Sequence, residues 1–187
     1  MTRTLYYTAA SLDGFIADAS NSVEWLNQLG DPEGGDYEGF IRDVGAVAMG
    51  STTYEWILAN HVHADPSAPR AWPYSQPSWV FSSHDLPGVQ GATIHFVRGD
   101  VRPVHAEMVR AAAGKNIWLV GGGDLVGQFY DHGLLDEMLV TVASVTLGAG
   151  APLLPRTITR PPLRLLSATA WGESFVRLHY QVLHPRE

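Results

Sequence analysis

The fold is decided by the stretch Asn116-Ile117-Trp118-Leu119-Val120-Gly121-Gly122-Gly123-Asp124-Leu125-Val126-Gly127-Gln128-Phe129, in which an apolar run stops at three glycines. The pattern predicts a buried strand, a tight turn and the start of a helix. Because glycine has no Cβ, the phosphates of a ligand can approach the backbone and meet the N–H groups at the helix start. Gly121 and Gly123 match part of the dinucleotide fingerprint G-x-G-x-x-G, but Val126 stands where its third glycine would be. The stretch is therefore either a ligand loop or a structural turn.

The composition predicts a single compact domain over residues 1–187. The chain is 45% hydrophobic and only 17% charged, which is typical of a protein with a sizeable core. Its net charge of −7 comes from acids scattered along the chain and argues against a nucleic-acid partner. An anionic ligand stays possible, because backbone amides outweigh net charge at short range. The chain has no cysteine, which excludes disulfides, thiol nucleophiles and cysteine metal sites.

Targeting and metal-binding signals are weak in this sequence. No basic and then apolar leader opens it, and no apolar run approaches the roughly 20 residues that span a bilayer. We therefore expect a cytoplasmic protein with no membrane partner. His61 and His63 lie in an expected loop over residues 61–77 without a third ligand at useful spacing, so we expect no metal. Lys115 is the only lysine and is a poor Schiff-base candidate.

Strand-like and helix-like patterns alternate along most of the chain. A final pair of alternating runs, 163–171 and 175–183, is joined at Gly172-Glu173 and predicts an antiparallel hairpin. The other expected strands are 4–10, 46–49, 78–81, 93–97, the run before the three glycines and 137–145, and the expected helices are 36–44, 51–58, 104–113 and the segment after the glycines. This order predicts an α/β layered domain with a mostly parallel mixed sheet and an antiparallel C-terminal hairpin.

Three of the expected strands end in turns rich in glycine or hydroxyl groups. These turns are Gly50-Ser51-Thr52-Thr53, Ser82-Ser83 and Gly121-Gly122-Gly123. The carboxyl ends of parallel strands share one edge of a sheet, where ligands bind. Each turn alone is better explained by ordinary capping, but together they offer the N–H and O–H donors that a nucleotide needs. Arg98, at the end of the next strand, is either solvated or pairs with the extra phosphate of NADP.

These motifs, in this order, resemble the dihydrofolate reductase-like superfamily over about residues 3–183. The turn at 50–53 with Tyr54-Glu55, the strand ending in Ser82-Ser83 and the triple glycine are similar to that superfamily's cofactor motifs. Within it, Ser11-Leu12-Asp13-Gly14 looks closest to the reductase, or C-terminal, domain of bifunctional riboflavin-biosynthesis enzymes (the RibD C-terminal domain family). The resemblance implies a three-layer sandwich of the dihydrofolate reductase type, NADPH as cofactor, and a homodimer.

The resemblance also implies which residues contact NADPH. Those flanking the nicotinamide are Ala9, Ala10, Ile16 and Ala17; those at the adenosine end and its phosphates are Gly50, Ser51, Thr52, Thr53, Ser82, Ser83 and Arg98; those on the pyrophosphate side are Gly121, Gly122, Gly123, Asp124, Leu125 and Val126.

Two departures from the resemblance concern the substrate. The riboflavin-pathway domain commonly has an acid just before its glycines, where this chain has Val120 as folate enzymes do, and beyond Arg42 the first helix offers no match to its phosphate-binding arginines. Folate enzymes carry a substrate-binding acid near that helix. The possible matches in this chain are Glu24, Asp36, Glu38 and Asp43.

Hydride transfer depends on alignment, exclusion of water and delivery of one proton. Asp13 is a candidate proton donor, or else the first residue of an Asp-Gly turn. Thr141 is a candidate substrate-side hydroxyl, or else a β-former in a sheet. Planar substrates can stack on aromatic rings, which otherwise belong to the core; the candidates are Trp25, Tyr54 and Trp72.

The leading hypothesis is therefore an NADPH-dependent reductase of the 5-amino-6-(5-phosphoribosylamino)uracil reductase type. The alternatives are dihydrofolate reductase activity on a pteridine, and a non-catalytic protein that binds NADPH or another ligand in the same fold.

Overall fold

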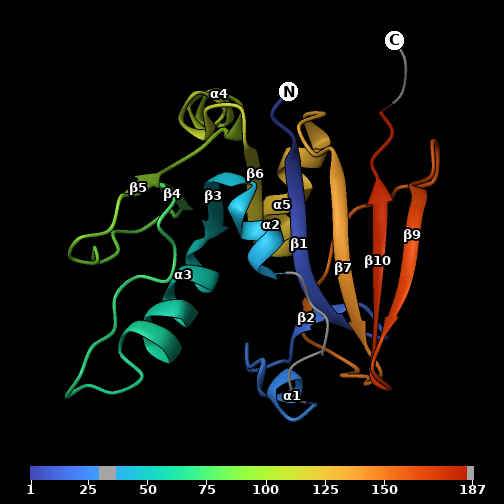
Figure 1. Ribbon diagram of the computed structural model, residues 1–187, viewed down its shortest axis with the longest axis horizontal. Helices are drawn as coiled ribbons and strands as arrows, with labels where there is room; N and C mark the ends of the chain where they lie inside the picture. The colour runs from blue at the N-terminus through green and yellow to red at the C-terminus, as the bar shows by residue number, and fades with distance from the viewer. Residues whose placement is uncertain (30–36, 185–187) are drawn as a thin grey trace.

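A computed structural model describes residues 1–29 and 37–184, and its centre is an eight-stranded sheet (Figure 1). The strand order is β5-β4-β3-β6-β1-β7-β10-β9. The bounds are β1 Thr4–Ser11, β3 Val44–Gly50, β4 Ser78–Phe81, β5 Ile94–Val97, β6 Asn116–Gly121, β7 Glu137–Ala143, β9 Arg164–Trp171 and β10 Phe175–Gln181. All neighbouring pairs from β5 to β7 are parallel, and β10 is antiparallel to both β7 and β9. The mostly parallel mixed sheet and its antiparallel C-terminal hairpin are confirmed.

Helices cover both faces of this sheet and make a three-layer sandwich, as expected. The helices are α1 Glu24–Asn27, α2 Tyr37–Arg42, α3 Ser51–Ile57 with a π-helical extension η1 Leu58–Val62, α4 Val101–Ala112 and α5 Gly123–Asp131. On β3, Ala46 and Ala48 pack in one core cluster with α4 and α5, while Val47 and Met49 pack in the other with α3. This alternation follows from the period of two in a strand that is buried on both faces.

The sequence placed some element boundaries wrongly. Helix α4 begins at Val101 rather than residue 104, because the Asp100 side chain accepts a hydrogen bond from the backbone N–H of Arg102 at 2.9 Å and caps the helix. The expected loop at 147–155 contains a short strand β8, Ala151–Pro152, which pairs with β2, Phe15–Ala17, in a second small sheet. Asp36, the expected start of α2, lies outside the described residues.

Neither a helix that could cross a bilayer nor a metal-binding cluster is found among the described residues. Within residues 1–29 and 37–184, no helix has both the length and the apolar character needed to cross a bilayer. The same residues contain no group of three or more His, Asp or Glu side chains arranged to hold a metal ion.

Candidate functional site

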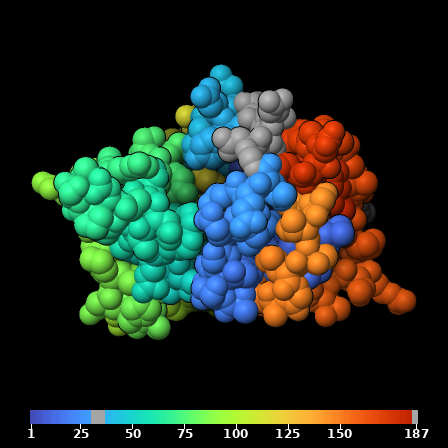
Figure 2. Space-filling model, turned by 90° about the horizontal axis from the view of Figure 1, so that it is seen from below, coloured from blue at the N-terminus to red at the C-terminus, as the bar shows by residue number. Residues whose placement is uncertain are grey.

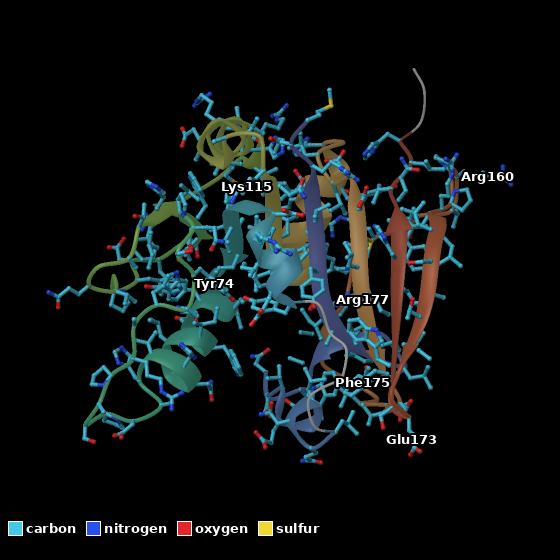
Figure 3. The ribbon with its side chains drawn as sticks, in the orientation of Figure 1. Tyr74, Lys115, Arg160, Glu173, Phe175 and Arg177 are labelled. Carbon is cyan, nitrogen blue, oxygen red and sulfur yellow. The ribbon has the colours of Figure 1, made fainter. Side chains whose placement is uncertain are left out.

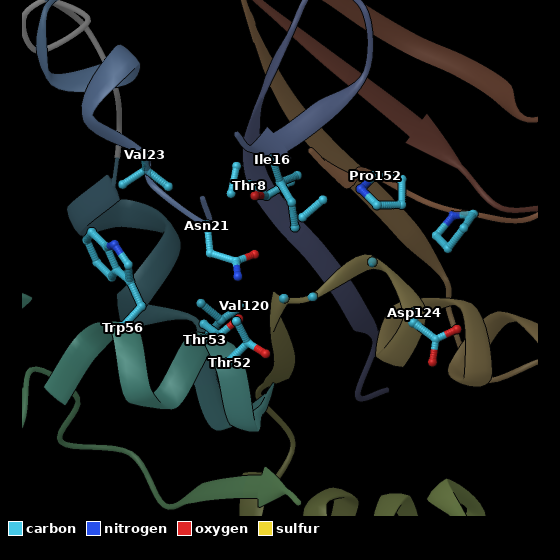
Figure 4. Close-up of a pocket in the computed structure, with 16 residues that line it drawn as sticks. Thr8, Ile16, Asn21, Val23, Thr52, Thr53, Trp56, Val120, Asp124 and Pro152 are labelled. Carbon is cyan, nitrogen blue, oxygen red and sulfur yellow. The ribbon is translucent and has the colours of Figure 1, made fainter. Parts of the chain in front are cut away.

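A cavity of about 340 Å³ opens at the edge of the sheet where β1, β3 and β6 end. Seen from below, this edge carries the early part of the chain, in blue, between the teal segment around α3 and the orange segment around β8 (Figure 2). Figure 4 shows side chains from all these segments around the cavity. The lining residues are Thr8, Ile16, Ala17, Asn21, Val23, Thr52, Thr53, Trp56, Val120, Gly121, Gly122, Gly123, Asp124, Ala151, Pro152 and Pro155.

The three glycines fit this cavity for different reasons. Gly121 has φ +150°, a backbone conformation that side-chain-bearing residues rarely adopt. A Cβ on Gly122 would meet no atom within 4 Å, so this residue borders open space. A Cβ on Gly123 would lie 2.3 Å from the carbonyl oxygen of Pro152 and 2.5 Å from that of Leu153. Gly123 therefore allows β8 to approach the start of α5.

Two helices begin side by side at this cavity. Gly50 is the N-cap of α3 and Gly122 is the N-cap of α5, and neither helix start has a side-chain cap. A Cβ on Gly50 would lie 3.8 Å from the backbone nitrogen of Gly122, so the two turns are neighbours. The first N–H groups of a helix have no partners inside the helix, and a glycine cap supplies none. These groups are donors suited to a phosphate.

One carboxylate lines the cavity, and an arginine balances it. The Asp124 side chain is 74% exposed and lies 3.3 Å from an Arg156 guanidinium nitrogen. Arg156 also pairs with Asp131 at 2.8 Å, and a Cβ on Gly127 would lie 2.5 Å from its Cζ. The hydrogen bond to Asp131, above all, raises the pKa of Arg156. The guanidinium thus offsets the negative charge of Asp124 beside a site suited to an anion.

A second cavity of about 370 Å³ contains several of the residues expected at the adenosine end. Its lining includes Ser51, Ser82, Ser83, Arg98 and Leu125. Arg98 here pairs with the exposed carboxylate of Asp85 at 2.6 Å. The hydroxyl of Ser82 donates to the carbonyl of His84 at 2.6 Å and accepts from its N–H at 3.1 Å. The Ser82 hydroxyl therefore holds the turn after β4; it caps no helix, because the next element is strand β5.

The remaining expected cofactor residues lie near the cavities but do not line them. Ala10 and Val126 are buried in the core cluster beneath α4 and α5. Ala9 lies in register with Thr141 of β7. Ala10 and Val126 can contribute backbone or packing, because their side chains are enclosed by protein.

Asp13 holds a turn. Its carboxylate accepts hydrogen bonds from the Ser11 hydroxyl at 2.6 Å and from the N–H groups of Leu147 and Gly148 at 3.0 and 2.7 Å. The Ser11 hydrogen bond is the largest cause of a lowered pKa for Asp13, and the Leu147 amide adds to it. A carboxyl group with a lowered pKa is ionised near neutral pH and holds no proton to donate. This geometry favours the turn alternative for Asp13.

The aromatic candidates for stacking differ in how deeply they are buried. Tyr54 is fully buried and donates to the Pro87 carbonyl at 2.6 Å, and buried Trp72 donates to the Ser78 hydroxyl at 3.2 Å. Both belong to the core. Half-buried Trp25 keeps its Nε1 without a hydrogen-bond partner among the described residues. Trp56, which the sequence did not single out, lines the cavity instead.

Among the described residues, Asp124 is the only acidic residue that lines the cavity and could bind a pteridine. Glu24, Glu38 and Asp43 are all exposed, and the Glu24 carboxylate accepts from the Asn27 amide at 3.1 Å. Asp36 lies outside the described residues. Arg42 is exposed as well, and its carbonyl accepts from Lys115 Nζ at 2.9 Å.

Comparison with known proteins identifies the family. Residues 59–176, more than half of the chain, match the RibD C-terminal domain. The chain belongs to the RibD C-terminal domain family. Bacillus subtilis YwjB is 31% identical to it over 178 residues, which cover 95% of this chain and 97% of YwjB. The resemblance inferred from the sequence motifs is confirmed.

Solved structures share the fold of this RibD C-terminal domain protein. A putative riboflavin biosynthesis protein from Shewanella sp. PV-4 has a TM-score of 0.78 at 24% identity, covering 96% of this chain and 98% of that one. The Thermotoga maritima deaminase/5-amino-6-(5-phosphoribosylamino)uracil reductase has a TM-score of 0.68 at 14% identity. The match covers 96% of this chain and 56% of that one. Enterococcus faecalis dihydrofolate reductase, complexed with NADP(H), has a TM-score of 0.60 at 13% identity, with 96% and 95% covered. The dihydrofolate reductase-like fold is confirmed.

Proposed function

We propose that this protein is an NADPH-dependent reductase of the 5-amino-6-(5-phosphoribosylamino)uracil reductase type. The observation that carries the proposal is the cavity between two helix starts that have no side-chain caps, with Gly122 facing open space. Membership of the RibD C-terminal domain family and the NADP(H) complex of a protein with this fold support the same assignment.

The lining of the two cavities fits a dinucleotide phosphate. When bound, NADPH supplies the hydride. Thr52 and Thr53 offer hydroxyls and amides beside the glycines, while Ile16 and Ala17 form an apolar wall that excludes water. In the second cavity, Arg98 exchanges its exposed partner Asp85 for the extra phosphate of NADPH. This last exchange gives the preference for NADPH over NADH.

Thr141 is 7% exposed and lies in register with Ala9, on the strand next to β1. We assign to Thr141 the role of orienting either the substrate or the water molecule that donates the proton. Asp13 keeps the loop at Leu147 and Gly148 in place and acts through that loop.

The riboflavin-type substrate is preferred over a pteridine for one reason. Folate enzymes carry a substrate-binding carboxylate, and of the four possible matches Glu24, Glu38 and Asp43 are exposed here, while Asp36 lies outside the described residues. A ligand-binding protein without turnover is the other alternative, because the cavity accounts for cofactor binding alone.

Fluorescence separates these possibilities. Trp56 lines the cavity, so bound NADPH should quench its emission, and Trp56→Phe should remove most of that quenching. Absence of quenching at saturating NADPH rejects both nucleotide-binding hypotheses. If NADPH binds, its oxidation with the aminouracil ribosyl phosphate supports the proposal, oxidation with dihydrofolate supports the folate alternative, and oxidation with neither supports binding without turnover.

We also propose a cytoplasmic homodimer. Strand β9 forms one edge of the sheet, and Leu165 and Leu166 on it are 54% and 46% exposed. An exposed edge strand with apolar side chains is suited to covering by a second chain. Sedimentation should give a dimer that Leu165→Glu dissociates, and a monomer at all concentrations rejects this part of the proposal.

A further inference from the structure

Arg177 on β10 lies in an unusual aromatic setting. Its Nη2 donates to the hydroxyl of Tyr7 at 2.8 Å, and its Cζ lies 3.6 Å from the ring centroid of Trp171. Tyr7 in turn stacks on Phe40 of α2 with ring centroids 4.3 Å apart. In the view of Figure 3, Arg177 lies between the ribbons of β1 and β10. The guanidinium is thus fixed by groups from β1 and β9, and Phe40 of α2 packs against Tyr7.

This guanidinium has no anionic partner among residues 1–29 and 37–184. In that part of the chain two arginines are half-buried, Arg156 and Arg177. Arg156 pairs with two carboxylates, Asp124 and Asp131, whereas no carboxylate of the described residues lies within 4 Å of Arg177.

The donors of Arg177 are also largely unused. Its Nε is buried and has no hydrogen-bond partner among the described residues, and the one hydrogen bond that the guanidinium donates to those residues runs from Nη2 to the Tyr7 hydroxyl. Nη1 also forms no hydrogen bond to the described residues, but unlike Nε it is not fully buried. A ligand can therefore reach Nη1. Withdrawing an arginine from water without a matching anion is costly, and most buried polar groups in proteins are paired. A fixed, half-buried guanidinium with spare donors is suited to bind an anion from outside the chain.

The position of Arg177 ties it to the proposed active site. Ala9, Thr141 and Arg177 are direct cross-strand partners on β1, β7 and β10. Adjacent strands lie about 4.8 Å apart, so this row spans about 10 Å, which is the length of a small heterocycle with a substituent. The next acidic side chain along β7 on this face, Glu137, already pairs with Arg3 and with His179 at 2.8 Å.

We infer that Arg177 recognises an anionic group of the substrate, a phosphate or a carboxylate, and sets the substrate's position relative to Thr141. This inference rests on the proposed reductase function for its identification of the ligand as substrate. Trp171 and Tyr7 hold the guanidinium in a single orientation, so little side-chain entropy is lost when the anion binds. The chain therefore replaces the missing arginines of the first helix with one from the C-terminal hairpin.

The anion site can be tested without any catalysis. The Nε–H of Arg177 is buried, so its ¹⁵N–¹H resonance should be resolved, and Arg177→Gln assigns it by deletion. Titration of the wild-type protein with inorganic phosphate, and separately with acetate, should shift this resonance with saturation. A stronger response to phosphate assigns a phosphate substituent, and a stronger response to acetate assigns a carboxylate. No shift with either anion overturns the inference.

Variants give the matched control. Arg164 lies on the neighbouring strand β9, is exposed and contacts the Gln181 side chain at 3.4 Å. Arg177→Gln should weaken anion binding by about 10- to 100-fold, because hydrogen bonds to charged groups contribute that much affinity. Arg164→Gln should leave it within about twofold. Equal losses in the two variants would show non-specific charge attraction and overturn the assignment.

The outcome is independent of the reductase proposal. NADPH affinity, followed through Trp56, reports on the cofactor cavity, whereas the Arg177 resonance reports on the anion. If NADPH fails to bind while phosphate shifts the resonance, the reductase proposal fails and the anion site stands. If an active substrate is found, Arg177→Gln should raise its KM far more than it lowers kcat, and an analogue lacking the anionic group should show no difference between wild type and variant.

Discussion

Gly122 and Gly123 are adjacent in the sequence, yet alanine should affect them in opposite ways. A Cβ at Gly123 would lie 2.3 Å from the Pro152 carbonyl oxygen, where ordinary contacts begin at 3.4 Å. Strand β8 would have to move by about 1 Å, which would disturb the hydrogen bond from the Leu153 N–H to Gly14 at 2.9 Å. At Gly122 the added methyl group would meet no atom within 4 Å.

The expected magnitudes follow from these contacts. Overpacking against backbone costs about 1–3 kcal/mol, so Gly123→Ala should lose about 2 kcal/mol of unfolding free energy and about 4–8 °C of Tm. Gly122→Ala replaces a glycine N-cap by a poorer one and should lose under about 1 kcal/mol. Its methyl group projects into open space beside the cavity, so NADPH should bind about tenfold or more weakly.

Thermal unfolding and NADPH titration of both variants measure the two effects. Gly122→Ala should combine a near-normal Tm with weak NADPH binding, and Gly123→Ala should have the lower Tm. If Gly122→Ala binds NADPH like the wild type, the cavity beside this glycine does not hold the cofactor. If Gly123→Ala melts at the wild-type temperature, the close approach of β8 does not constrain the glycine.

Three further predictions concern other parts of the fold. Gly45→Ala places a Cβ 2.4 Å from the Ala112 carbonyl oxygen, so denaturant unfolding should show a loss of about 1–3 kcal/mol. The hydrogen bonds of Arg102 lower the pKa of Asp100 to about 2, so the ionised Asp100 carboxylate stabilises the fold above the unfolded pKa of about 4 and loses this effect as the pH falls through 2. Asp100→Ala should therefore lower Tm at pH 7, and the Tm difference between variant and wild type should vanish near pH 2. Arg98→Ala should reduce the preference for NADPH over NADH by about tenfold, with NADH affinity unchanged in the same titration.

Local chemistry explains what the sequence could predict. Glycines after an apolar run, a Gly-Glu turn between alternating runs and hydroxyls after strands determine structure within a few residues, so the glycine turn, the hairpin and most strands were predicted correctly. The same reasoning brought Thr52, Thr53 and the three glycines to one cavity. It assigned the wrong start to α4, because Asp100 acts as its cap from outside the apolar pattern.

Long-range packing explains what the sequence could not predict. The two residues of β8 carry no pattern and form a strand only because β2 lies beside them. Trp56 and Asn21 line the cavity through the folding of distant segments over the sheet. Arg177 looks like any exposed residue of an alternating strand, and its setting depends on Tyr7, which is 170 positions away in the chain.

Strand β1 separates the proposed cofactor cavity from the proposed anion site, because successive side chains of a strand point to opposite faces. Thr8 lines the proposed cofactor cavity, while the side chain of its neighbour Tyr7 lies on the other face of the strand, where its hydroxyl accepts a hydrogen bond from Arg177 and, with Trp171, holds the guanidinium in place. Ala9 continues the Tyr7 face in register with Thr141. A hydride transfer needs the nicotinamide and the substrate to lie next to each other in alignment, and the end of β1 borders both proposed sites. Substitutions on the two faces should therefore separate cleanly, with Thr8 variants changing NADPH affinity and Tyr7→Phe changing anion affinity.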